Sequence, residues 1–313
     1  MKHILKALGV AHSLILPNCL TRSRISRSLT GDGIWFIMKS WGGKPRGRQG
    51  KGMFSIGVYG ADGREKAFVS GEKQANLLYE GVYQEGDEIR FEAGVAYARV
   101  RVDAAVDEAR VYLPEGRFTY RLPLAGDNRK VYAPGAFEGE KHLLSIRADD
   151  GAGTYNLACN PADQRGEVSA YPHATANVET RNESVFCARN VIDGLTIATG
   201  HGIWPYESWG IGARQDAYLT VDFGREVELD RVVLYLRADF PHDAWWISGV
   251  LETDGGARFA FPLKGVDGPQ EIELGGVRAT RLTLKELVKC DMPSAFPSLR
   301  QLMAYGRNVT EIG

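Results

Sequence analysis

The segment AYLTVDFGREVELDRVVLYLR, residues 217–237, constrains the fold more strongly than any other because apolar and polar side chains alternate along it. Every second residue is apolar in 219–223 and again in 232–236. A two-residue period places alternate side chains on opposite faces of a β-strand, and it is typical of strands with one buried and one solvated face. The segment therefore predicts two β-strands, 217–223 and 231–237, around a short polar turn.

Similar short runs continue along the chain from Met53. They are rich in β-branched and aromatic residues, and turns containing Gly, Pro, Asp or Asn separate them. The strands expected in the first part of the chain are 54–58, 66–69, 88–91, 96–102, 108–113, 118–122 and 141–147. Residues 74–79 are predicted to form one or two helical turns instead of a strand. The strands expected after residue 237 are 246–251, 258–262, 270–274, 280–284 and 302–305.

A polar, turn-rich stretch, NPADQRG at residues 160–166, divides these strands into two blocks. Short strands without long helices between them favour a β-sandwich over a parallel α/β sheet. We therefore predict an all-β protein with two antiparallel β-sandwich domains in tandem, residues 53–158 and 167–308. A disordered N-terminal extension, residues 1–52, precedes them.

The extension differs from the rest of the chain in charge. It holds ten lysines and arginines and one acidic residue, whereas the remainder holds 28 basic and 38 acidic residues. Its second half is rich in Arg, Ser and Gly, a composition that buries too little apolar area to offset the entropy of the chain. Disorder is the expectation for this segment.

Three interpretations of the extension remain open. It is an upstream region that is not part of a protein starting at Met53, or an export signal, or a true basic tail. The first predicts a cytoplasmic protein, and the second a secreted or lipid-anchored one that uses residues 1–20. The apolar run 4–20 is interrupted by polar and charged residues and is shorter than the about 20 residues that span a membrane. No membrane span is therefore expected, and the low content of interleaved aromatic residues argues against a nucleic-acid partner.

The four cysteines stand apart along the sequence. No CxxC pair is present, and no histidine lies at ligand spacing from a cysteine. The sequence therefore predicts neither a zinc site nor a dense disulfide framework.

Aromatic and charged residues gather in two loops that flank residues 217–237. Four of the six tryptophans fall between residues 204 and 246. A sugar needs a flat apolar surface for its C–H face and fixed donors and acceptors for its hydroxyls, and these residue types supply both. The candidate ligand-binding residues are His201, Trp204, Tyr206, Glu207, Trp209, Arg237, Asp239, His242, Asp243 and Trp245. The strand order predicts that the two loops share one end of the sandwich.

The second block resembles discoidin-type (coagulation-factor C-type) domains of the galactose-binding-like superfamily over residues 173–306. The resemblance rests on HATANVETRNESVFCARNVIDG at 173–194, on AYLTVDFGREVELDRVVLYL at 217–236, on TRLTLKEL at 280–287 and on LRQLMAYG at 299–306. It implies a jelly-roll sandwich whose loops at one end bind glycans.

The resemblance also implies a structural calcium between the Asp-Gly loop and an acidic residue of the last strand. Asp193 is present, but the last strand offers Gln301, whose amide oxygen is a weaker calcium ligand than a carboxylate. Calcium near Asp193 is therefore not expected, and no other cofactor is.

The sequence predicts non-catalytic carbohydrate binding, with a carbohydrate ligand as the partner and the oligomeric state open. The first alternative is a glycan-active hydrolase or lyase that pairs Glu207 with Asp239 or Asp243, or uses His242 as a base. The second is a scaffold that binds another protein. No nucleophile elbow, HExxH motif or phosphate-binding loop is present, so we assign no catalytic residue.

Overall fold

The computed structural model describes residues 53–166, 168–197, 204–205, 207–238 and 244–309, together with the backbone of two strands, 25–29 and 35–39. In these residues every paired strand runs antiparallel to its neighbours, and the only helices are four short 3-10 turns. The all-β, antiparallel fold class predicted from the sequence is confirmed. No helix in the described residues is long and apolar enough to cross a membrane.

The first sandwich consists of two sheets that enclose one core. One sheet has the order β4-β3-β6-β9: β3 (Phe54–Tyr59), β4 (Glu65–Gly71), β6 (Glu88–Glu92) and β9 (Arg117–Arg121). The other contains, in order, β5 (Gln74–Glu80), β10 (Lys141–Ala148), β7 (Tyr97–Arg101) and β8 (Ala109–Tyr112). Apolar side chains of both sheets, such as Ile56, Phe91 and Ile146, are fully buried between them.

Strand β5 corrects one sequence prediction. Residues 74–79 were expected to form helical turns, and that expectation is wrong. Ala75, Leu77 and Tyr79 are buried and alternate with more exposed neighbours, as in a strand. Pairing with β10 along seven residues decides the conformation, because β-structure depends on its neighbours more than on local propensity.

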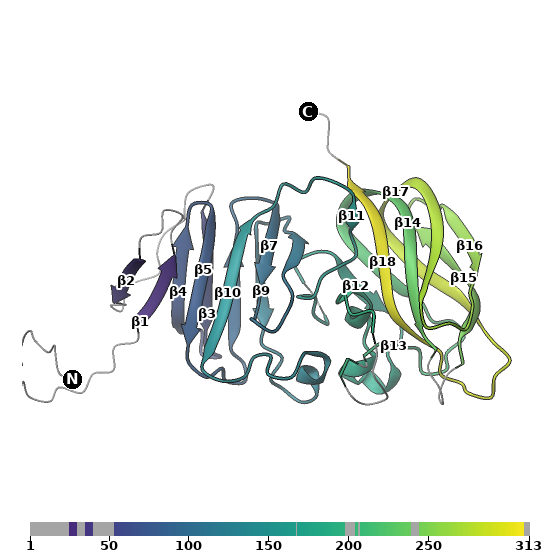
Figure 1. Ribbon diagram of the computed structural model, residues 1–313, viewed down its shortest axis with the longest axis horizontal. Coiled ribbons are helices and arrows are strands. Elements are labelled where there is room, and N and C mark those ends of the chain that lie inside the picture. The colour runs from purple at the N-terminus through teal and green to yellow at the C-terminus, as the bar shows by residue number, and fades with distance from the viewer. Residues whose placement is uncertain are drawn as a thin grey trace, which may run out of the picture.

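Two strands lie within the N-terminal extension. β1 (Ile25–Leu29) and β2 (Trp35–Lys39) form an antiparallel hairpin, and β1 pairs with β5 at the edge of the sheet, on the left of Figure 1. The rest of the extension lies outside the described residues.

The second sandwich is built from eight strands. They are β11 (Tyr155–Asn156), β12 (His173–Ala176), β13 (Trp209–Gly210), β14 (Leu219–Arg237), β15 (Trp246–Thr253), β16 (Arg258–Pro262), β17 (Pro269–Lys289) and β18 (Ser298–Asn308). The main order is β11-β18-β14-β17-β15-β16, with β12 on β14 and β13 on β18. Figure 1 shows this sandwich beside the first along the long axis of the molecule.

Strand β14 differs from its prediction. The two expected strands are halves of one continuous strand with a register shift between Asp222 and Val227, so the expected turn is a bend. Gly224 lies in this bend with φ of +67°, and a Cβ there would collide with the ring of Tyr171, so only glycine fits. The inward side of both halves is as predicted, because the six apolar residues are at most 1% exposed: Leu219, Val221, Phe223, Val232, Leu234 and Leu236.

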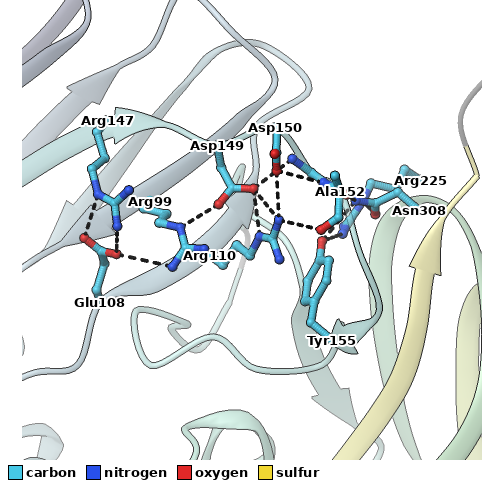
Figure 2. A network of polar contacts seen from close by, with 11 residues as sticks. Arg99, Glu108, Arg110, Arg147, Asp149, Asp150, Ala152, Tyr155, Arg225 and Asn308 are labelled. Atoms are coloured by element: carbon cyan, nitrogen blue, oxygen red, sulfur yellow. Dashed lines mark hydrogen bonds and ion pairs between the residues drawn. The ribbon is translucent and has the colours of Figure 1, made fainter.

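A polar network joins the two sandwiches (Figure 2). Arg110 of β8 donates to Asp149 and stacks on the ring of Tyr155, with 3.7 Å between the guanidinium carbon and the ring centroid. Asn308 donates to the hydroxyl of Tyr155 at 3.0 Å, and Arg225 donates to Asn308 at 2.7 Å. The stacking of Arg110 on Tyr155 joins the first sandwich to β11 of the second, whereas the hydrogen bonds of Asn308 lie within the second sandwich. Arg225 adds a second link, because its guanidinium lies over the rings of Tyr97 and Tyr112 of the first sandwich, 5.4 and 5.2 Å from their centroids.

Candidate functional site

The segments on both sides of β14 meet at one end of the second sandwich. Trp209 and Leu236 both pair with Leu299 of β18, and Arg237 pairs with Ser298. The strand ends that flank the two predicted loops, Trp209 and Arg237, therefore lie at the same end of the sandwich, while most of the loop residues lie outside the described residues.

We call this end the loop end. Among the described residues it comprises 195–197, 204–205, 207–208, 238, 244–245, 263–268 and 290–297. Contacts of Trp245 with Gly265 and of Arg300 with Asp267 bring the segment 263–268 to the same place.

Trp209 and Trp246 lie in the core below the loop end. Both side chains are at most 1% exposed, and their ring centroids are 6.1 Å apart. The indole N–H of Trp209 donates to the carbonyl of Val178 at 2.9 Å. Burial leaves neither ring face open to a ligand, so the structure places Trp209 among the core residues that support the loops.

Trp245 and Trp204 are half-buried. The ring of Trp245 packs on Gly265 so closely that a Cβ at that glycine would lie 2.5 Å from the indole. Its backbone N–H points to the sulfur of Cys290 at 3.4 Å. Trp204 lies on the side of the loop end that faces the first sandwich, where it lines a cavity with residues 124–134. These two tryptophans have partly open rings, and they have different surroundings.

Glu207 and Arg237 are buried beneath the loops, at 5% and 4% exposure. Both side chains carry a charge close to the low-dielectric core. Hydrogen bonds and charge interactions are stronger there than in water, and they hold neighbouring loops in place. Glu207 contributes to the raised pKa of Asp193, which shows that the two carboxyl groups are close enough to interact.

The remaining candidate residues lie outside the described residues: His201, Tyr206, Asp239, His242 and Asp243.

Sequence reasoning missed two residues at the loop end. Arg300 is 3% exposed, and its Nη1 donates to the carbonyl of Thr196 at 2.9 Å and to Asp267 at 2.8 Å. Its Nε and Nη2 atoms have no hydrogen-bond partner among the described residues. Phe296, in the segment between β17 and β18, is 56% exposed. The MPSAFPS context of Phe296 could have marked it, because a large aromatic residue in a Pro- and Ser-rich loop has no core to fill.

The residues at the place of the family's calcium do not fit a cation. Gln301 Nε2 donates to Asp193 Oδ1 at 2.6 Å and to the carbonyl of Asn190 at 2.7 Å, so an N–H group already occupies two of the oxygens that a cation would need. Gln301 Oε1 accepts from the backbone of Gly194 at 3.2 Å. The glutamine amide thus ties the Asp-Gly loop to the last strand.

Burial raises the pKa of Asp193 to about 7, against the opposing charge of Arg189. No group of three or more His, Cys, Asp or Glu side chains with metal-binding geometry is present in the described part of the chain.

The chain matches no protein-family model and no curated protein. Solved structures resemble it over about half its length. A chitosan-binding module from Paenibacillus sp. IK-5 is 19% identical, with 49% of this chain and 99% of that chain covered and a TM-score of 0.35. A fucose-binding module from Streptococcus pneumoniae is 12% identical, with coverage of 49% and 99% and a TM-score of 0.35.

A third structure is a family 32 carbohydrate-binding module from C. perfringens, solved with galactose, which is 13% identical. It covers 42% of this chain and 91% of its own, with a TM-score of 0.33. At TM-scores below 0.5 these similarities add nothing to what strand pairing establishes about the fold. All three of these similar structures are named as modules that bind a carbohydrate.

Proposed function

We propose that this protein binds a glycan without catalysing a reaction on it, through the loop end of the second sandwich. The observation that carries the proposal is that partly open aromatic rings and buried charged groups gather at one end of the sandwich. Trp204 and Trp245 are half-buried and Phe296 is exposed, while Arg237 and Arg300 are buried.

This combination suits a sugar. The C–H face of a pyranose ring packs on an aromatic ring, and its hydroxyls need donors whose positions are fixed. Arg300 meets the second need, because Thr196 and Asp267 hold its Nη1 atom. Its Nε and Nη2 atoms are buried and have no hydrogen-bond partner among the described residues.

The burial of Glu207 favours binding without catalysis over hydrolysis. A glycosidase would need this carboxyl group as its acid, but the side chain is only 5% exposed and is enclosed by protein. A general acid must lie within hydrogen-bond reach of the glycosidic oxygen. Buried beneath the loops, Glu207 supports the site instead of contacting the scissile bond.

A glycan array probed with the full chain tests the proposal. The panel includes chitosan, fucosylated and galactosylated oligosaccharides, because these are the ligands named for the similar modules. We expect Trp245→Ala and Phe296→Ala to weaken binding of the best ligand about tenfold, since stacking on an aromatic ring contributes about 1 kcal/mol and the apolar contact adds to it. Tyr305→Ala is the matched control, because Tyr305 lies on β18 opposite Asn156 and away from the loop end.

Two outcomes would contradict this function. Absence of binding to every glycan, with a folded protein, removes the glycan from the proposal. The protein is a hydrolase instead if it releases shortened oligosaccharides from a bound glycan and if Glu207→Gln abolishes this release.

A further inference from the structure

A cavity of about 420 Å³ lies between the first sandwich and Trp204 of the loop end. The described residues that line it are Leu124, Gly126, Arg129, Lys130, Tyr132, Ala133, Pro134 and Trp204. All but Trp204 belong to the segment around η1 (Asn128–Val131), after the last strand of one sheet of the first sandwich. Its volume falls within the range of about 300–1,000 Å³ typical of small-ligand sites.

Contacts between the sandwiches fix the walls of this cavity. The backbone N–H and the hydroxyl of Ser184 donate to Asp127, at 3.1 and 2.7 Å. The guanidinium of Arg189 lies over the ring of Tyr132, 5.0 Å from its centroid. Within the first sandwich, Tyr120 donates to the hydroxyl of Tyr132 at 2.9 Å. Because the walls of the site are already ordered, little conformational entropy is lost when a ligand binds.

The charge of the lining is one-sided. Arg129 and Lys130 are cationic, and none of the described lining residues is acidic. Arg129 forms an ion pair with Glu138, whereas Lys130 has no ion pair among the described residues. The charge of Lys130 acts on the nearby carboxyl groups of Asp127 and Glu183, and its exposed, flexible side chain can also reach an anionic ligand group in the cavity.

Trp204 gives the cavity an aromatic wall. Its side chain is half-buried and lines the cavity, so part of its ring is open to the apolar face of a ligand.

We propose that this cavity takes an acidic sugar, namely a pyranose that packs on Trp204 and directs a carboxylate or a sulfate ester toward Lys130 and Arg129. The inference rests on the proposed glycan binding and adds to it a ligand class and a second binding surface. The first sandwich then contributes directly to recognition.

Calorimetric titration of the full chain tests the inference with three matched oligosaccharides: one that contains a uronic acid, one that carries a sulfate ester and one that is neutral. We expect one of the acidic ligands to bind about tenfold more tightly than the neutral one, with a preference that shrinks as salt is added. The two acidic ligands distinguish a carboxylate from a sulfate. Lys130→Gln should remove the preference and leave the affinity for the neutral ligand unchanged, and Lys130→Arg should retain it.

Lys73→Gln is the charge-matched control, because Lys73 is an exposed lysine in the turn between β4 and β5 that does not line the cavity. Trp204→Ala should weaken binding of all three ligands. If Lys130→Gln binds every ligand as the unchanged protein does, the inference is overturned and the proposed function stands. If no glycan binds, both are overturned.

Discussion

The indole rings of Trp209 and Trp246 meet with their centroids 6.1 Å apart and their planes inclined by 36°. Trp209 pairs through its backbone with β18, whereas Trp246 pairs with β17. The ring contact therefore joins two buried residues whose backbones pair with different strands. Two of the four clustered tryptophans support the loops, and the other two, Trp204 and Trp245, have surface open to a ligand.

Replacement of these tryptophans should separate the two roles. We expect Trp209→Ala to lower the free energy of unfolding by about 3–5 kcal/mol, because it leaves a large cavity in a packed core. Trp245→Ala, at a half-buried position, should cost clearly less and weaken glycan binding. Urea denaturation and glycan titration of both variants measure the two effects. Equal losses of stability would show that Trp245 is a core residue as well.

A second prediction concerns the core face of β14. Leu234 is fully buried, and Leu234→Ala should cost about 2–5 kcal/mol of stability. Leu143→Ala is the same substitution at a residue that is 45% exposed, and it should cost far less. Denaturant midpoints of the two variants give the comparison, and similar values would contradict the assigned orientation of β14.

The third prediction concerns calcium. Because Gln301 Nε2 donates to both Asp193 and Asn190, a chelator should leave the melting temperature unchanged. Gln301→Glu replaces the amide by a carboxylate, and we expect it to make stability depend on calcium according to RT ln(1 + [L]/Kd). Thermal melts with chelator and with millimolar calcium test both statements. A chelator-induced drop in the unchanged protein would mean that a cation, and not the amide, ties the loop.

The fourth prediction is a pH dependence from His173. Burial of the ring lowers the pKa of His173, but the hydrogen bond to Asp163 at 2.7 Å and the charge of Asp163 outweigh it, so the pKa is raised. A raised histidine pKa means that the folded state holds the proton more tightly than the unfolded state. The resulting stability is complete below the unfolded pKa of about 6.5 and is lost as the pH rises through the higher folded value.

Unfolding free energies measured at pH 5.5 and at pH 8.5 test this dependence. The unchanged protein should be more stable at the lower pH, and His173→Gln should reduce this margin. The margin that remains in His173→Gln belongs to Asp193, whose pKa is raised to about 7 and which changes stability in the same direction. A margin of the same size in His173→Gln would assign it to other groups.

The local sequence pattern predicted the structure correctly where buried residues recur at every second position of one strand. The alternation in 219–236 predicts inward side chains correctly because a strand turns each second residue to the same face. The same pattern in Gln74–Glu80 was misread, since pairing with the distant β10 decides that conformation. The continuity of β14 was also missed, because Gly224 is typical both of a turn and of a bend at a bulge.

The ligand-facing residues were harder to predict. Arg300 lies where the register between β14 and β18 shifts, between Tyr235 and Leu236, and an irregularity of this kind leaves no period in the sequence. Lys130 and Trp204 are brought together only by the packing of one sandwich on the other. Contacts between distant segments have no local pattern that marks them.

The continuity of β14 has a consequence for the exchange of backbone amide hydrogens with solvent. Thr220 pairs with Thr283 in the first half of the strand, and Val233 pairs with both Glu271 and Met303 in the second half. Because one strand and its partner β17 carry both halves, opening either half strains the ladder of the other. The amides of Thr220 and Val233 should therefore exchange together, as one slow unit at the centre of the second sandwich.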